Sequence, residues 1–208
     1  MLKLGATAIA LALVLAPQFV RPTLGVLDAR QPVSFFIEDG NGVPGYHDSD
    51  RELAKLAVEA WSRESSSKLK FTESKQGDGA LIRLRWISPT EGLYGETQRV
   101  EVNGKPGAIV YVMPQVSVQG EPLASRAAQD GLLRDTIVYL TCVHELGHAV
   151  GLSHTRKFED IMYYFGYGGD ILDYFMRYRN KLQSRADIVK HSGLSTADVE
   201  VLRDLYRN

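Results

Sequence analysis

Three histidines and one glutamate lie close together in the sequence and have a spacing suited to metal chemistry. His144 and His148 are four residues apart, so on a helix both imidazoles leave the same face and can bind one metal ion. Glu145 lies about 100° further round the helix, from where its carboxylate can reach a water on that metal without being a ligand. Gly151 can end the helix in a left-handed conformation, and the reversed chain then brings His154 back toward the same ion.

Three neutral imidazoles with one open coordination position make a catalytic zinc site, because structural zinc sites are closed by four protein ligands. The zinc is expected to lower the pKa of its water to about 7. Glu145 is then expected to take that proton as the water attacks a substrate. The alternative is two buried histidines on a helix with a surface glutamate. The third histidine, followed eight residues later by Met162, favours the metal site.

Residues 144–154 have the pattern HExxHxxGxxH. Together with Met162 this pattern resembles the metzincin zinc endopeptidases, and most closely their matrixin branch. The Met-turn of that clan corresponds to residues 160–164. Thr155 departs from the pattern, since matrixins usually carry Ser after the third histidine. The resemblance implies a zinc-dependent endopeptidase with one catalytic zinc and with a peptide or protein as substrate.

The resemblance also suggests roles for the Met-turn. Met162 is expected to form an apolar floor beneath the imidazoles without binding zinc. Tyr164 matches a tyrosine that approaches the zinc in some metzincins, so it is a candidate for stabilising the oxyanion or for lining a substrate pocket. Tyr163 is the competing candidate. The aromatic residues of segment 163–176 are expected either to line the pocket for the residue after the scissile bond or to pack in the core.

The fold implied by the resemblance is α+β. It has a twisted, mostly parallel five-stranded sheet with an antiparallel edge strand, packed on two long helices and followed by a smaller C-terminal lobe. Residues 93–96 are expected to form the exposed edge strand above the cleft, where an extended peptide can pair with the main chain.

The hydrophobic pattern of the chain agrees with this order of elements. It predicts strands over residues 32–37, 69–72, 80–87, 93–102 and 108–113, with a hairpin at Asn103-Gly104. It predicts one helix with Asp48 or Ser49 as N-cap, a second over 134–150, a third from near Asp170, and a last one over 195–206 with Ser195 or Thr196 as N-cap. Residues 115–131 are predicted to form a polar loop.

The N-terminus indicates export. Lys3 precedes an apolar run over residues 4–16, which has the length of a signal-peptide core and is shorter than the roughly 20 residues that span a bilayer. We expect residues 1–25 to be a signal peptide or an N-terminal anchor; the alternative is a buried or disordered N-terminal helix. Residues 26–208 are expected to form a single catalytic domain, with an upper lobe over 26–151 and a lower lobe over 152–208. The protein is accordingly expected to be secreted, periplasmic or located in the cell envelope.

The net charge and the numbers of cysteines and histidines indicate which partners and cofactors to expect. The formal net charge of −1 gives no indication of nucleic-acid binding, and membrane contact is expected only if the N-terminal segment stays uncleaved. Cys142 is the only cysteine, so no internal disulfide can form, and it is expected to be a buried small residue. His47 and His191 are the only other histidines, so a second histidine-rich zinc site is not supported. Calcium binding is possible, but no ligand spacing indicates it. The sequence does not define the oligomeric state.

Two other functions fit the motif less well. A zinc-stabilised peptide-binding protein without turnover would have no need of Glu145. An amide hydrolase acting on small or cell-wall substrates would need only the HExxH helix, whereas this chain also carries the third histidine and the Met-turn.

Overall fold

The structure is a computed structural model that describes residues 26–91 and 94–207. The expected export segment, residues 1–25, and Leu93 of the expected edge strand lie outside the described residues. Within those residues, no helix is both long and apolar enough to cross a membrane. The export signal and the division into two lobes stay predictions.

A five-stranded mixed sheet with strand order β2-β1-β3-β5-β4 forms one layer of the fold. Its strands are β1 (Val33–Ile37), β2 (Phe71–Glu73), β3 (Ile82–Trp86), β4 (Gly95–Val102) and β5 (Lys105–Val112). All neighbouring pairs are parallel except β4 with β5, which are antiparallel and place β4 at the edge. Asn103 and Gly104 join them with positive φ angles of 52° and 72°, as a two-residue hairpin turn requires. The predicted sheet, including its antiparallel edge strand, is confirmed.

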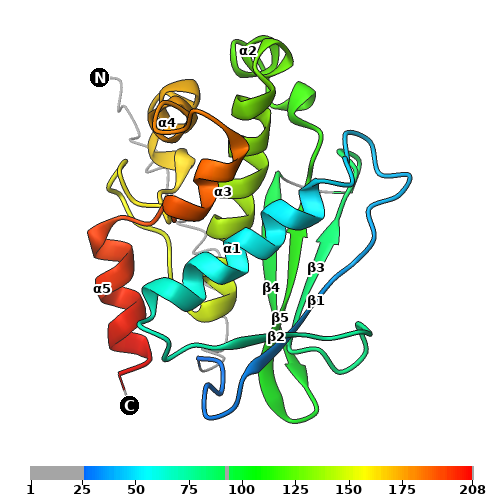
Figure 1. Ribbon diagram of the computed structural model, residues 1–208, viewed down its shortest axis with the longest axis vertical. Helices are drawn as coiled ribbons and strands as arrows, with labels where there is room; N and C mark the ends of the chain where they lie inside the picture. The colour runs from blue at the N-terminus through cyan, green and yellow to red at the C-terminus, as the bar shows by residue number, and fades with distance from the viewer. Residues whose placement is uncertain (1–25, 92–93, 208) are drawn as a thin grey trace, which may run out of the picture.

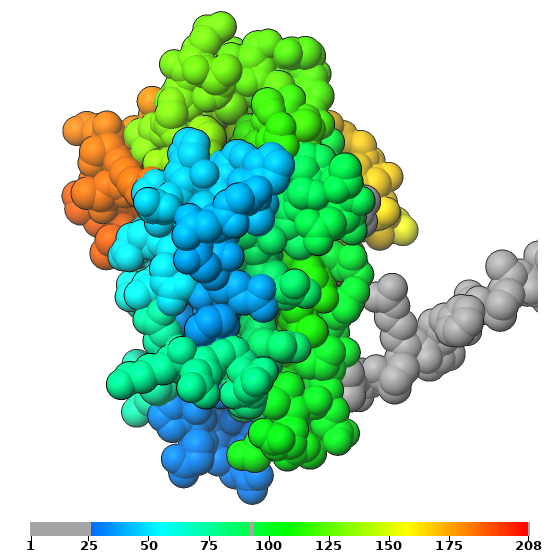
Figure 2. All heavy atoms as spheres, turned by 90° about the vertical axis from the view of Figure 1, so that its right-hand side faces the viewer, coloured from blue at the N-terminus to red at the C-terminus, as the bar shows by residue number. Residues whose placement is uncertain are grey.

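Alternating side chains give the sheet one apolar face. In β3, Ile82, Leu84 and Trp86 are buried, while the intervening arginines are more exposed. Strands with this alternation bury one face and leave the other solvated. Figure 1 shows the two long helices, α1 (Asp50–Glu64) and α3 (Gly131–Val150), crossing on one side of the sheet. Figure 2 shows the molecule from the side on which the sheet lies in Figure 1, and this face is formed mostly by the N-terminal half of the chain, coloured blue to green.

Helix α1 packs against α3 close to the predicted metal ligand His144. The buried residues of α1, among them Leu53, Ala57 and Trp61, recur at helical spacing and form one stripe. Trp61 is fully buried, and its indole Nε1–H donates to the carbonyl oxygen of Val143 at 2.9 Å. This bond fixes the backbone of α3 one residue before His144.

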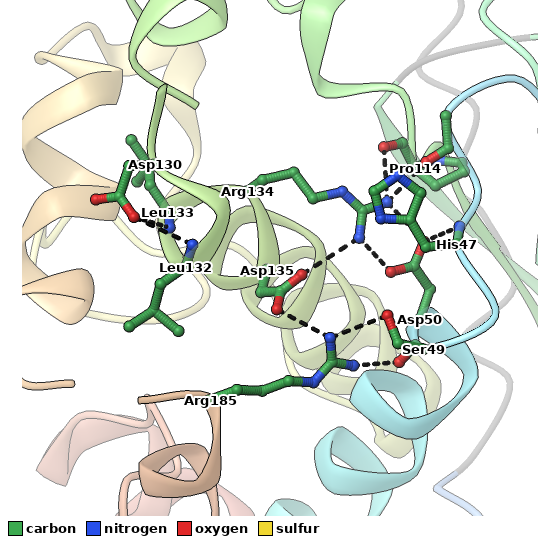
Figure 3. Close-up of polar contacts among 11 residues, drawn as sticks. His47, Ser49, Asp50, Pro114, Asp130, Leu132, Leu133, Arg134, Asp135 and Arg185 are labelled. Atoms are coloured by element: carbon green, nitrogen blue, oxygen red, sulfur yellow. Dashed lines mark hydrogen bonds and ion pairs between the residues drawn. The ribbon is translucent and has the colours of Figure 1, made fainter. Parts of the chain in front are cut away.

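A buried ion pair ties the N-terminal ends of α1 and α3 together (Figure 3). Asp50 is fully buried and accepts from both terminal nitrogens of Arg134, with Nη2 to Oδ2 at 2.6 Å. Arg134 also donates to the carbonyl oxygen of Gly45 at 2.7 Å. Burial lowers the pKa of Arg134, but Asp50 outweighs burial and raises it above its ordinary value. Arg185 extends the network by pairing with Asp135 at 2.9 Å.

Helix α3 begins three residues before the predicted start. Asp130 is its N-cap, and the Asp130 carboxylate accepts from the amides of Leu132 and Leu133, both at 3.1 Å (Figure 3). Such a cap satisfies amides that have no partner within the helix. Ser49 occupies the N-cap position of α1, but its side chain does not cap the helix. It accepts instead from Arg185 at 3.0 Å.

The prediction that residues 115–131 form a loop is wrong. They contain a 3₁₀ turn, η1 (Val116–Val118), and a short helix, α2 (Leu123–Gln129). Leu123 and Ala127 lie one turn apart and are buried, and α2 packs on α3. Two buried residues in so short a helix give a weak periodic signal, so tertiary packing decides this helix.

The C-terminal helices begin where the sequence predicts. Asp170 caps α4 (Ile171–Arg179), and Ser195 caps α5 (Thr196–Leu205) in a capping box with Asp198. The elements η2 (Phe165–Tyr167) and η3 (Arg185–Lys190) were not predicted. Figure 1 shows α4 and α5 beyond α3, on the side away from the sheet.

Candidate zinc site

The end of α3 and the turn after it bring three histidines together. His144 and His148 lie on one face of α3, and Gly151 follows the helix with a φ of 112°. The Leu152 amide then bonds back to the Gly147 carbonyl at 2.9 Å, which closes the helix and reverses the chain. His154 returns to the same face, and ligand atoms of the three histidines lie within 4.8 Å of one another. We call these three residues the histidine triad.

Hydrogen bonds fix the orientation of two of the imidazoles. His144 Nδ1 lies 2.6 Å from the carbonyl oxygen of Ile161, and His148 Nδ1 lies 3.0 Å from that of Leu152. A carbonyl can only accept, so both Nδ1 atoms carry the proton. Their Nε2 atoms then present free lone pairs toward the centre of the triad. This is the tautomer that second-sphere carbonyls impose on metal-binding histidines.

The geometry of the Nε2 atoms fits a bound cation. His154 Nε2 lies 3.0 Å from His148 Nε2 and 3.3 Å from His144 Nε2. One proton on His154 serves only one of these neighbours well, whereas a metal ion between the three nitrogens satisfies all of them. Partial burial, together with the neighbouring histidines, lowers the pKa of the half-buried His144 to about 3 and that of the half-buried His148 to about 4. Burial also lowers the pKa of His154, so the triad is neutral at pH 7, as metal binding requires.

Three imidazoles without a fourth protein ligand match a catalytic zinc site. Among residues 26–91 and 94–207, no carboxylate or thiolate joins the grouping of possible ligands. Zinc sites with three protein ligands keep a position for water or substrate. The residues present therefore fit a catalytic zinc ion. Cys142 is fully buried within the core, as predicted, and takes no part.

Glu145 directly follows His144 of the triad on α3 and is buried. The hydroxyl of Thr97 in β4 lies 2.8 Å from Oε2 of Glu145. Burial raises the pKa of Glu145 to about 7, although the Thr97 hydrogen bond lowers it. A cation bound nearby would counteract the effect of burial. A carboxyl group that titrates near working pH is suited to take up and return a proton.

The Met-turn packs under α3. Met162 is fully buried. Its sulfur lies so close to Gly147 that a Cβ on that glycine would come within 2.4 Å. The Met162 carbonyl accepts from the amide of Thr155 at 2.8 Å, which ties the turn to the residue after His154. The structure thus places Met162 in the core beneath the triad helix, where an unbranched thioether fills space well.

The two tyrosines of the Met-turn have different environments. Tyr163 is buried, and its hydroxyl donates to the carbonyl oxygen of Gly168 at 2.7 Å. Tyr164 is 48% exposed, and its ring centroid lies 4.8 Å from that of His154. Of the two candidates, Tyr164 is therefore the one beside the triad.

The aromatic segment 163–176 divides between core and surface. Tyr163, Tyr174 and Phe175 pack in the core, whereas Tyr164 and Tyr167 are exposed and lie edge to face at 5.4 Å. The expectation of core packing thus holds for three of these rings, and the lining of a substrate pocket by the exposed ones stays a prediction.

The sequence analysis missed residues of β4 that contact α3 near the triad. Thr97 contacts Glu145, and Arg99 donates to the carbonyl oxygen of Ala149 at 3.1 Å. A period of two puts Gly95, Thr97 and Arg99 on one face of a strand. That signal was available, but only the packing of β4 on α3 shows which residues they meet.

The sheet, the two long helices and the histidine triad together define a metzincin-type zinc peptidase domain. A sequence model of the matrixin family matches residues 34–170, from β1 to the start of α4. The chain belongs to the matrixin family, whose domain is associated with zinc-dependent metalloendopeptidase activity. None of the curated proteins compared with this chain matches it.

Proposed function

We propose that this protein hydrolyses internal peptide bonds of extended polypeptides, with the histidine triad as the zinc ligands and Glu145 as the general base. The observation that carries the proposal is the position of Glu145. Glu145 directly follows the triad residue His144 on α3, and its buried carboxylate contacts Thr97 of the edge strand β4.

The chemistry needs a water made nucleophilic and a proton moved twice. Zinc, when bound, supplies a water of lowered pKa and polarises the carbonyl oxygen. Glu145 would take a proton from that water while the oxygen of the water attacks the carbonyl carbon of the substrate. It then gives the proton to the leaving amine when the C–N bond breaks. The low exposure of Glu145 keeps bulk water from competing for this proton.

The edge strand β4 supports a polypeptide as substrate. β4 is the last strand in the sheet order, so its outer edge has no strand partner among the described residues. An extended peptide can add there through main-chain hydrogen bonds, independently of most side chains. A peptide bound there would lie along the strand whose inward residue Thr97 contacts Glu145. This arrangement favours endopeptidase activity over hydrolysis of small amides.

Tyr164 is proposed to contact the substrate. Its ring is exposed and lies against His154, so it borders the open side of the triad. From there its hydroxyl can donate to the developing oxyanion, or its ring can line a side-chain pocket. Tyr164→Phe separates the two roles, because it removes the hydroxyl and keeps the ring.

Cleavage of a random peptide library by the purified protein tests the proposal. We expect internal cleavage that stops on addition of a chelator and returns on addition of zinc. Tight zinc binding without cleavage of any peptide would instead indicate a binding protein. Cleavage confined to terminal residues would overturn the endopeptidase assignment.

A further inference from the structure

The inward face of β4 is directed at α3, the helix that carries His144 and His148 of the triad. Along the strand, Gly95, Thr97 and Arg99 are partly covered, while Glu96 and Gln98 are exposed. The covered residues contact the end of α3 in order, from Glu145 to Ala149. This face therefore follows the segment that holds the proposed base.

Thr97 makes two polar contacts with the same residue. Its Oγ1 lies 2.8 Å from Oε2 of Glu145 and 2.8 Å from the backbone carbonyl oxygen of Glu145. A hydroxyl has one proton to donate and lone pairs to accept with. It can donate to Oε2 when the carboxylate is charged.

The backbone at Gly95 passes close to the other oxygen of the same carboxylate. A Cβ at residue 95 would lie 2.5 Å from Oε1 of Glu145 and 2.8 Å from its Cγ. The backbone of β4 therefore approaches as closely as glycine allows. The Thr97 hydroxyl at one oxygen and the Gly95 backbone near the other leave the Glu145 carboxylate little room to move toward β4.

We infer that Thr97 is a positioning residue that holds the Glu145 carboxylate in place between α3 and β4 for its role as the proposed base. The inference rests on the proposed function, in which Glu145 takes and returns a proton. Thr97 acts through Glu145 and does not touch the substrate. Because the outer edge of β4 is the proposed peptide-binding edge, one strand would align both the scissile bond and the base.

Thr97→Val tests this inference, because valine keeps the shape of threonine and removes the hydroxyl. Hydrogen bonds to charged groups are strong enough for their loss to lower kcat by about ten- to a hundredfold, with KM and zinc content unchanged. Thr97→Ser restores the hydroxyl and should remain within about threefold of wild type. Thr72→Val, an exposed position on β2, is the matched control and should behave as wild type. Thr97→Ala serves the same purpose as Thr97→Val if the valine variant does not fold.

A second measurement does not depend on activity. In crystals of the zinc-free protein, Oε2 of Glu145 should leave its wild-type position in Thr97→Val and keep it in Thr97→Ser. An unmoved carboxylate in Thr97→Val, or a kcat equal to wild type, would overturn the inference. Equal loss of kcat in both variants would also overturn it, since the hydroxyl would then not be the group responsible. If the wild-type protein cuts no peptide, the proposed function fails, and the crystal structures still decide whether Thr97 holds Glu145.

Discussion

Removing either partner of the buried Asp50–Arg134 ion pair should strongly destabilise the fold. The pair joins the first turn of α1 to the first turn of α3 in the interior (Figure 3). Loss of one partner leaves a buried charge without compensation, which typically costs about 3–5 kcal/mol of unfolding free energy.

The structure predicts different costs for the two partners. After Asp50→Ala, Arg134 still donates to the Gly45 carbonyl and lies 3.4 Å from a carboxylate oxygen of Asp135, so the cost should fall near the lower end, about 3 kcal/mol. After Arg134→Ala, the fully buried Asp50 keeps the amide of His47 at 2.9 Å as a partner. That variant should lose about 5 kcal/mol.

Urea unfolding followed by circular dichroism measures these costs, and the double variant completes the cycle. The double variant should lose less unfolding free energy than the two single variants added together, because both charges are removed at once. The difference should reach up to about 3 kcal/mol. Lys190→Ala is the control: Lys190 pairs with Asp187 at 2.8 Å, but its side chain is 72% exposed. Exposed pairs contribute about 0–1 kcal/mol. A cost for Arg134→Ala as small as that of the control would refute the reasoning.

Three further predictions concern the metal, the pH dependence and export. The purified protein should bind close to one zinc per chain, and alanine at any triad histidine should greatly weaken binding; full occupancy in His154→Ala, by metal analysis, would contradict the three-histidine site. Burial raises the pKa of Asp130. The hydrogen bonds from Arg179 and from the two capped amides outweigh this effect, so the pKa of Asp130 lies below its ordinary value of 3.8. Its contribution to stability is therefore present above pH 3.8 and lost as the pH falls through the lower, folded-state value. The urea midpoint of Asp130→Asn should then lie below that of wild type at pH 7 and approach it in acid, and a constant gap would contradict this. Residues 1–30 fused to a reporter should direct its export; a wholly cytoplasmic reporter would count against a signal, and a membrane-bound one would favour an anchor.

Local signals in the sequence predict much of the site and the order of elements. The HExxHxxGxxH spacing places the triad because it depends only on helix geometry and one left-handed residue, both of which are local. The caps at Asp170 and Ser195 are predictable for the same reason. The strands follow from alternation and the hairpin from Asn103-Gly104.

The parts that were missed depend on contacts between distant segments. Helix α2 is short and buries only Leu123 and Ala127, which gives too weak a pattern. The contact of Thr97 with Glu145 joins residues 48 positions apart. No period in the sequence gives the register of β4 against α3. The choice between Tyr163 and Tyr164 likewise depends on which ring the core accepts.

Replacing Glu145 while keeping the zinc tests the central claim most directly. Glu145→Ala leaves the three histidines in place, so its zinc content should equal that of wild type. Its rate of peptide cleavage should fall by about 10²–10⁴-fold, the usual contribution of general acid–base catalysis. Glu145→Asp keeps the carboxylate with a shorter reach and should be impaired less. Cleavage by the alanine variant within a few-fold of wild type, at matched zinc content, would contradict the account.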